Sequence, residues 1–129
     1  MEQLKIGDKA PDFSAKNQNG EIISLKDYKG KHLILYFYPR DNTPGCTAEA
    51  CNLQENMDFW TRQGYYIVGV SPDGEKSHKG FAEKFKLGFN LLSDPDKNLM
   101  KAYGAWGEKK MYGKLYEGVL RTTFVIGPD

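Results

Sequence analysis

The chain is 129 residues long, which suits one domain over residues 1–129 that buries a continuous core without disulfides or metals. Hydrophobic residues make up 40% of the chain and charged residues 27%, a composition that excludes global disorder. Lysine and arginine number 18 and aspartate and glutamate 17, so no excess charge indicates a nucleic acid or an anionic membrane as partner.

The first half of the chain predicts a hairpin, a buried strand and a helix. Asn19-Gly20 stands between two partly alternating runs in residues 11–25, the composition of a two-residue hairpin turn with positive φ at both positions. Residues 33–39 form an apolar run closed by proline, typical of a strand covered on both faces. An apolar stripe then predicts one helix that Gly64 ends. The stripe consists of Cys46, Ala50, Leu53, Met57 and Trp60.

The second half continues the alternation of strands and helices. Residues 65–70 predict a second buried strand, and residues 75–86 predict a polar helix with one apolar face. A short strand at 91–92, a short helix after Asp94-Pro95 and a last strand over 119–126 complete the chain. This rhythm predicts an α/β fold, with helices on the faces of a mainly parallel sheet.

The candidate site lies in the loop after the first buried strand, because such sheets bind ligands beyond the carboxyl ends of their strands. Cys46 falls in the first turn of the next helix, where unpaired N–H groups and the positive end of the dipole stabilise a thiolate. Ahead of it, Thr43 offers a hydroxyl, Pro44 fits a first helical turn and Gly45 lets a ligand approach the backbone. The alternative is that Cys46 is a small, buried, unreactive hydrophobe.

The spacing between Cys46 and Cys51 indicates a cycling disulfide and argues against a structural one. In an α-helix, residues five apart have Cα atoms about 8.5 Å apart. A disulfide needs Cα atoms within roughly 7 Å. If both residues are helical, the reduced chain must therefore unwind locally before the bond can close.

Membrane, metal and histidine chemistry have little support in the sequence. The longest apolar stretch is far shorter than the roughly 20 residues of a membrane span, and MEQLKIGDKAPDF lacks the pattern of an export signal, so we expect a cytoplasmic protein. Thiols stay reduced there, which favours catalytic or metal-binding cysteines. His32 and His78 lie far from the cysteines and C-x-x-C is absent, so we expect no metal site. Each histidine is interpreted as a solvated residue near an element boundary.

One segment, YFYPRDNTPGCTAEAC from Tyr36 to Cys51, resembles the P-x-x-x-T-x-x-C pattern of the peroxiredoxins. Together with LLSD, YGAWGEK and RTTFVI further along, it is similar to the bacterioferritin comigratory protein or peroxiredoxin Q subfamily over nearly the whole chain. The resemblance implies a thioredoxin-like fold, with a central mixed sheet, flanking helices and an N-terminal β-hairpin. The family continues through another strand and a helix beyond the position of Asp129, so we expect one sheet face and one edge to be poorly protected here.

The resemblance also implies a catalytic site. Cys46 matches the peroxidatic cysteine and Cys51 the resolving cysteine, while Pro44 and Gly45 would contact the substrate. The remaining catalytic matches are Thr43, which orients the peroxide, Pro39, which shields the pocket, and Arg121, the active-site arginine. A guanidinium beside a thiolate stabilises the ionised sulfur and the charge that develops on the peroxide oxygens.

The implied reaction reduces hydrogen peroxide and organic hydroperoxides, with thioredoxin or a similar dithiol as reductant. Cys46 becomes a sulfenic acid and condenses with Cys51, and no cofactor is needed. We expect a monomer. Residues 106–108 either line the site or form a plain turn with a packed aromatic. A redox sensor or thiol-dependent chaperone, and an oxidoreductase acting on protein disulfides, remain the alternative functions.

Overall fold

A computed structural model describes residues 7–111 and 113–128 of the chain. The expectation of no export signal falls partly on residues 1–6, which lie outside the described residues. The elements in chain order are β1 (Ser14–Lys16), β2 (Ile22–Ser24), the 3-10 helix η1 (Leu25–Tyr28), β3 (His32–Phe37), α1 (Pro44–Glu55), α2 (Met57–Arg62), β4 (Tyr65–Ser71), α3 (Glu75–Phe85), β5 (Asn90–Ser93), α4 (Asn98–Ala102), β6 (Trp106–Met111), β7 (Lys114–Val119) and β8 (Thr122–Ile126).

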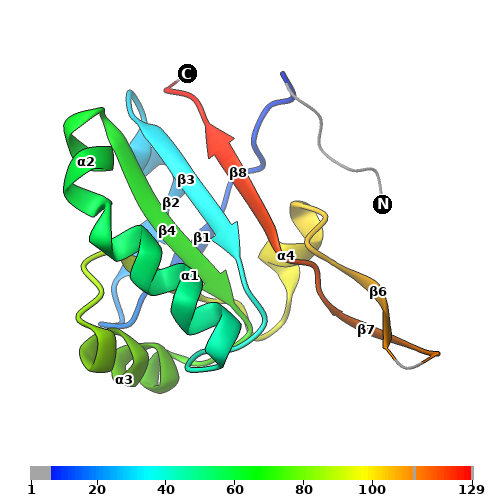
Figure 1. Ribbon diagram of the computed structural model, residues 1–129. Helices are drawn as coiled ribbons and strands as arrows, with labels where there is room; N and C mark the ends of the chain where they lie inside the picture. The colour runs from blue at the N-terminus through cyan, green and yellow to red at the C-terminus, as the bar shows by residue number, and fades with distance from the viewer. Residues whose placement is uncertain (1–6, 112, 129) are drawn as a thin grey trace.

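A four-stranded mixed sheet with the order β5-β4-β3-β8 forms the centre of the molecule (Figure 1). Strand β3 runs parallel to β4, β4 runs parallel to β5, and β8 pairs with β3 in the antiparallel sense. The two apolar runs of the sequence, β3 and β4, are the central strands, which are covered on both faces. The predicted fold class, a thioredoxin-like mixed sheet with flanking helices and an N-terminal hairpin, is confirmed.

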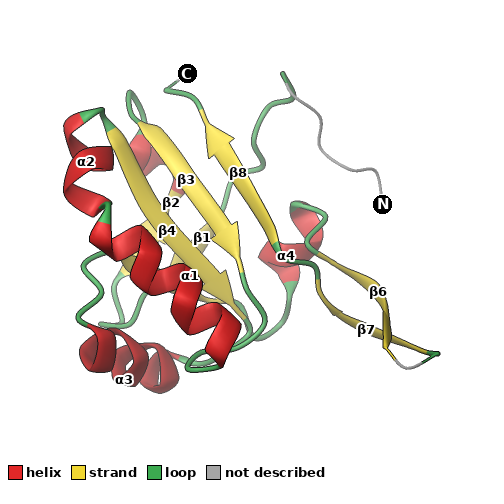
Figure 2. Cartoon of the chain, viewed as in Figure 1, coloured by secondary structure: helices red, strands yellow, loops and turns green. Residues whose placement is uncertain are grey.

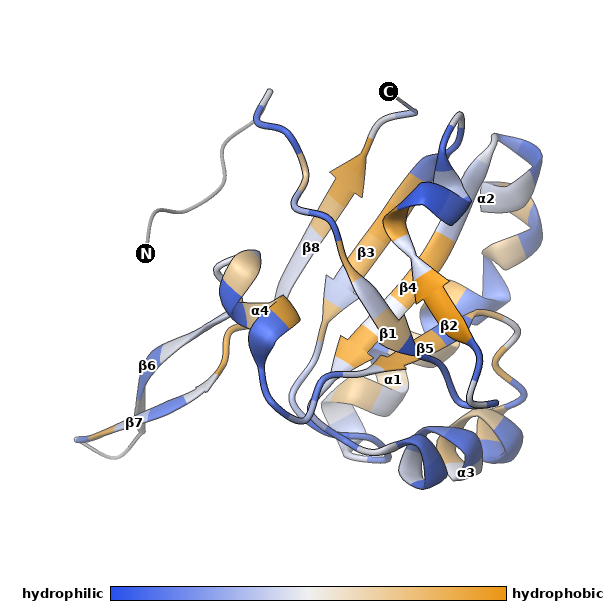
Figure 3. Ribbon diagram, turned by 180° about the vertical axis from the view of Figure 1, so that it is seen from behind, coloured by the Kyte–Doolittle hydropathy of each residue, from blue (hydrophilic) through white to orange (hydrophobic). Residues whose placement is uncertain are grey.

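Successive residues of β3 contribute to two separate cores, one on each face of the sheet. Ile34 and Tyr36 pack with α1 and α3, whereas Leu33, Leu35 and Phe37 pack on the opposite face. Figure 2 shows α1 and α2 lying across β3 and β4. Seen from behind in Figure 3, the N-terminal hairpin and α4 cover the other face, and the strands of the main sheet are mostly hydrophobic. The loop after β3 therefore leads from the sheet directly into the helical layer.

The N-terminal hairpin forms as predicted, but its predicted two-residue turn is wrong. Lys16 pairs with Ile22, so five residues separate the paired strands, and of the pair Asn19-Gly20 only the glycine has positive φ. The side chain of Asn17 organises this wider loop, because its Oδ1 accepts hydrogen bonds from the backbone N–H groups of residues 19 and 21, at 2.9 and 3.0 Å.

The predicted single helix is interrupted at Asn56, which separates α1 from α2. The side-chain Nδ2 of Asn56 donates to the carbonyl of Asn52 at 2.9 Å, and this competition for a helical carbonyl is typical of asparagine. The apolar stripe nevertheless survives the break, since all its members pack in one core: Cys46, Ala50, Leu53, Met57 and Trp60.

The predicted last strand over residues 119–126 is two strands that belong to different sheets. Strand β7 pairs with β6 in a hairpin that projects from the body of the molecule (Figure 1), while β8 joins the main sheet. The backbone N–H of Leu120 donates to the carbonyl of Ala105 at 2.6 Å. This hydrogen bond ends the hairpin, and the chain then continues into β8. Trp106 is a packed aromatic, half-buried against the core, but it lies in β6 and not in a turn.

The face and edge of β8 are open, as expected from the sequence. Val125 is 64% exposed, and a groove of about 1110 Å³ lies between β8, η1 and residues 7–12. Among the described residues, no helix has the length and apolar character needed to cross a membrane.

Candidate active site at the start of helix α1

The first turn of α1 contains backbone N–H groups that are not bonded to a capping side chain. Thr43 caps the helix with extended backbone angles, and Pro44 occupies the first turn, as predicted. No acidic residue lies in this turn, and no side chain caps it. Because the first N–H groups of an α-helix have no partner within the helix, they can stabilise an anion placed at this end.

Cys46 lies in this first turn, and the guanidinium of Arg121 lies directly against its sulfur. The Nη2 atom of Arg121 donates to Cys46 Sγ at 3.0 Å. The two residues meet because β8 is antiparallel to β3: Thr122, at the start of β8, pairs with Phe37, at the end of β3. The loops that carry Cys46 and Arg121 therefore leave the same edge of the sheet.

Gly45 allows this close approach. A Cβ atom at position 45 would lie 3.1 Å from Arg121 Nη2, tighter than ordinary contacts. The glycine was expected to let a ligand approach the backbone, and in this structure the guanidinium occupies that space.

Glu49 holds the other side of the same guanidinium and was not singled out from the sequence. Its Oε1 lies 3.4 Å from Arg121 Nη1, in a pair whose side chains are 33% and 43% exposed respectively. Burial raises the pKa of Glu49, and the charge of Arg121 opposes that shift. Its position three residues after Cys46, on the same face of a helix, is the signal that could have identified it.

The sulfur of Cys46 is less accessible than the sequence suggested, since the residue is only 1% exposed. It belongs to the same core cluster as Tyr36, Tyr38 and Ala50. Arg121 is its partly exposed neighbour, so the approach to the sulfur lies beside the guanidinium.

Cys51 is half-buried in the same helix, and both cysteines are free thiols. Both lie within α1, which meets the condition under which a disulfide between them requires unwinding. The structure thus presents a reduced, fully folded form of the site.

Two further predicted residues, Thr43 and Pro39, lie in the loop between β3 and α1. The hydroxyl of Thr43 donates to the carbonyl of Arg40 at 2.9 Å, and no hydrogen bond joins Thr43 to Cys46 in the described part of the chain. Pro39 is half-buried directly after Tyr38.

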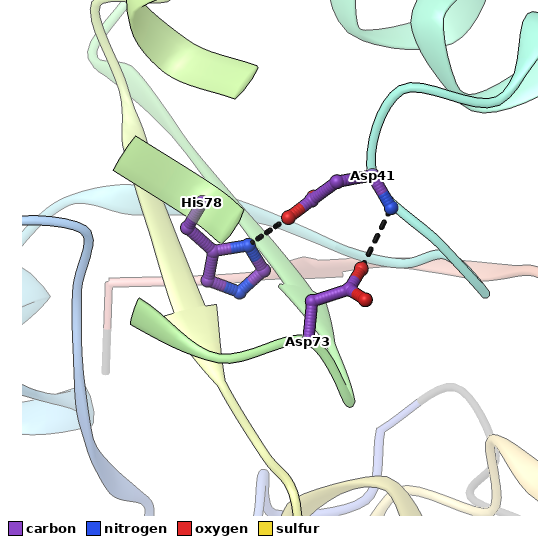
Figure 4. Close-up of side chains that lie close together, drawn as sticks. All are labelled: Asp41, Asp73 and His78. Atoms are coloured by element: carbon purple, nitrogen blue, oxygen red, sulfur yellow. Dashed lines mark hydrogen bonds and ion pairs between the residues drawn. The ribbon is translucent and has the colours of Figure 1, made fainter. Parts of the chain in front are cut away.

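His78 contradicts the interpretation of both histidines as solvated residues. Its side chain is completely buried, and its Nδ1 lies 2.7 Å from Asp41 Oδ2 (Figure 4). The signal was available, because His78 precedes Phe81 and Ala82 by three and four positions and so shares the buried face of α3. His32 is half-buried and stacks on Tyr65, with ring centroids 4.6 Å apart.

The groups nearest to a metal site among the described residues are Asp41, Asp73 and His78, whose ligand atoms lie within 4.8 Å of one another. These atoms are already engaged: Asp41 Oδ2 faces His78, and Asp73 Oδ2 accepts from the backbone N–H of Asp41 and the hydroxyl of Ser71. The ligand atoms of the cluster are hydrogen-bonded to one another and to neighbouring groups, so a cation would have to break these hydrogen bonds to bind.

Comparison with known proteins decides the family. A model of the AhpC/TSA family matches residues 6–129. The chain belongs to this family. Peroxiredoxin Bcp of Bacillus subtilis is 46% identical over 126 residues, covering 98% of this chain and 80% of that protein. Peroxiredoxin Bcp of Escherichia coli is 45% identical over 129 residues, covering all of this chain and 83% of that protein.

Solved structures of the same subfamily share the fold. Peroxiredoxin Q of Xanthomonas campestris superposes with a TM-score of 0.86 at 38% identity, over 91% of this chain and 74% of that one. Peroxidoxin BcpB of Mycobacterium tuberculosis gives 0.86 at 34% identity, over 98% and 81%. The predicted peroxiredoxin family and Bcp subfamily are confirmed, and the AhpC/TSA chain is an enzyme, a thiol peroxidase.

Proposed function

We propose that this AhpC/TSA protein reduces hydrogen peroxide and organic hydroperoxides through Cys46, with Cys51 as the resolving thiol. The observation that carries the proposal is the 3.0 Å contact between Arg121 Nη2 and Cys46 Sγ at an uncapped helix start. A structure of the Xanthomonas campestris bacterioferritin comigratory protein is named for alkyl peroxide reduction and a trapped intermediate, which supports the organic substrates.

In the first step, the Cys46 thiolate attacks one oxygen of the hydroperoxide. An S–O bond forms, the O–O bond breaks, and the leaving oxygen takes a proton and departs as water or an alcohol. Arg121 stabilises the negative charge on the sulfur and on the departing oxygen, since its two terminal nitrogens already face Cys46 and Glu49.

The residues of the preceding loop would hold the substrate. Thr43 would turn its hydroxyl from the Arg40 carbonyl to the peroxide, a rotation about one side-chain bond. Pro44 and Gly45 are exposed and would contact the substrate beside the guanidinium, and half-buried Pro39 would shield the pocket.

In the second step, the Cys51 thiol attacks the Cys46 sulfenic acid, an S–S bond forms, and water leaves. The reaction needs α1 to unwind, because both residues are helical. Thioredoxin or a similar dithiol would then reduce the disulfide. The proposed enzyme is a cytoplasmic monomer that uses no bound cofactor.

One equivalent of peroxide tests the proposal. In the wild-type protein, mass spectrometry should find a loss of about 2 Da, located in a bridge between the peptides of Cys46 and Cys51. Cys46→Ser should consume no peroxide. Cys51→Ser should complete one turnover and stop at the sulfenic acid, which a dimedone-type probe traps. Peroxide consumption by Cys46→Ser at the wild-type rate would refute the assignment.

Repeated turnover separates the peroxidase from a redox sensor. A peroxidase supplied with thioredoxin consumes many equivalents of peroxide per chain. A sensor that changes its surface on oxidation needs only one.

A further inference from the structure

A second ionic pair lies on the far side of the loop that carries the site, and the proposed chemistry does not use it. Asp41 and His78 are buried with side-chain exposures of 3% and 0%. Asp41 Oδ1 accepts from the hydroxyl of Tyr38 at 2.5 Å, and its Oδ2 accepts from the hydroxyl of Ser77 at 2.8 Å. Figure 4 shows Asp41 between His78 and Asp73, which come from α3 and from the loop before it.

Both ring nitrogens of His78 lie within hydrogen-bond distance of an oxygen atom, so the ring is held at two points. The Nε2 of His78 lies 2.8 Å from the Leu92 carbonyl, which can only accept, and the Nδ1 faces Asp41. Burial alone would raise the pKa of Asp41, but hydrogen bonds from His78, Tyr38 and Ser77 and the charge of His78 hold it below its usual value. Among the described residues, the other ionisable groups around the pair include Tyr38, Asp73 and Tyr36.

These contacts fasten the chain five residues before Cys46. The backbone N–H of Asp41 donates to Asp73 Oδ2 at 2.6 Å, so both the main chain and the side chain of Asp41 are bound to other elements. Asn42 follows in a left-handed conformation, and α1 begins two residues later. Further along α1, Glu49 and Arg121 form a partly exposed ion pair, and Gln54 Oε1 accepts from the backbone N–H of Gly88 at 2.6 Å.

We propose that Asp41 and His78 are positioning residues that stop the unwinding of α1 at position 41 and keep Cys46 in its peroxide-reactive place until it is oxidised. The inference rests on the proposed disulfide step, in which the S–O bond of the Cys46 sulfenic acid breaks, the S–S bond with Cys51 forms, and water carries away the thiol proton. Weakening the pair raises the population of the unwound form. It therefore speeds disulfide formation without speeding the attack on peroxide.

The first test uses the reduced protein and no peroxide, so it remains valid if the proposed function fails. Asp41→Asn keeps the shape of the side chain and removes its charge. Hydrogen exchange over residues 39–51 should become about tenfold faster, the scale of losing a hydrogen bond to a charged group. Asp96→Asn makes the same chemical change at an exposed aspartate and should leave exchange unchanged. Ser77→Ala removes one donor to Asp41 from the exposed surface of α3 and should give a smaller increase.

The second test separates positioning from general support of the fold. In Asp41→Asn, stopped-flow fluorescence of Trp60, half-buried in α2 just after α1, should show disulfide formation about fivefold or more faster, whereas the peroxide step stays within about threefold or slows. Val68→Ala loses stability on the opposite face of the sheet and should leave the ratio of the two rates unchanged.

Unchanged exchange over 39–51 in both Asp41→Asn and Ser77→Ala, or equal slowing of both kinetic steps, would overturn the proposal. If Asp41→Asn does not fold, Ser77→Ala decides alone. An absence of any disulfide in the wild-type protein would instead refute the proposed function, and the exchange result would still show whether position 41 limits the opening of α1.

Discussion

Two ionic pairs flank the loop between β3 and α1, and they differ in almost every physical property. Arg121 and Glu49 are 43% and 33% exposed and lie 3.4 Å apart, whereas His78 and Asp41 are 0% and 3% exposed and lie 2.7 Å apart. The exposed pair contributes little to stability, because water screens its charges. Its guanidinium is therefore free to serve the sulfur and the substrate.

The buried pair cannot exchange its partners so easily, since an uncompensated charge in the interior is costly. The buried pair Asp41–His78 thus holds the loop in place, and the exposed pair Arg121–Glu49 serves the proposed reaction. Substitutions that affect stability and substitutions that affect rate should fall on opposite sides of this loop.

The largest effect is expected from removing one partner of the buried pair. His78→Leu leaves the Asp41 carboxylate buried without its main partner and should lower the free energy of unfolding by about 3–5 kcal/mol. The double variant Asp41→Ala/His78→Leu removes both charges and should recover most of that loss. Urea denaturation of the reduced proteins measures both. Additive losses in the double variant would mean that the two residues do not act as a pair.

The exposed pair should show the reverse pattern. Arg121→Gln should slow the reaction with peroxide by about 10²–10³-fold, because it removes a charged donor from the sulfur and the leaving oxygen. Its free energy of unfolding should change by less than about 1 kcal/mol. Stopped-flow kinetics and urea denaturation test the two parts. Arg62→Gln, at an exposed arginine in the last turn of α2, is the matched control and should react at the wild-type rate.

Two neighbouring tyrosines, Tyr36 and Tyr38, should show effects of intermediate size on the free energy of unfolding. Both are 1% exposed, but Tyr38 donates to Asp41 while the hydroxyl of Tyr36 has no partner among the described residues. Tyr38→Phe should lower the free energy of unfolding by about 1.5–3 kcal/mol, the range for a hydrogen bond to a charged group. Tyr36→Phe should leave it unchanged or raise it by about 1 kcal/mol. Equal losses in the two variants would contradict this ranking.

The smallest effect is expected in the pH dependence of stability, to which Asp41 and Glu49 should contribute with opposite signs. The pKa of Asp41 is lowered, chiefly by hydrogen bonds that outweigh burial, so its stabilisation is present above the unfolded value of about 3.9 and is lost as the pH falls through the folded value. The pKa of Glu49 is raised by burial, with Arg121 opposing, so its contribution is present below the unfolded value of about 4.3 and is lost as the pH rises through the folded value.

These signs predict opposite trends in urea denaturation across the acidic range. The stability deficit of Asp41→Asn relative to the wild-type protein should shrink on acidification. Glu49→Gln should gain stability relative to the wild-type protein as the pH rises. Parallel trends in the two variants would show that the carboxylates occupy equivalent environments.

Local patterns in the sequence were sufficient for the two central strands and for the helix start at Cys46. The apolar runs predicted β3 and β4, and Thr43-Pro44-Gly45 predicted the helix start beneath Cys46. Long-range contacts escaped this reasoning. Arg121 lies 75 residues from Cys46, and only the antiparallel pairing of β8 brings the two together.

Buried polar side chains were also missed. His78 was interpreted as a solvated residue near an element boundary because it belongs to no motif, yet a carboxylate 37 residues earlier in the chain contacts it in the core. A buried polar residue depends on a partner that periodicity cannot locate. The same reason explains why Arg121 entered only through the family resemblance, and why Glu49 was not recognised at all.

The position of β8 has a consequence for the newborn protein. Translation delivers β3, α1 and both thiols well before the segment that contains Arg121, and domains begin to organise from their N-terminal parts during synthesis. A ribosome-bound chain that stops short of β8 therefore carries its cysteine without the guanidinium. The peroxide reaction proposed for Cys46 would therefore gain its guanidinium only after β8 has paired with β3.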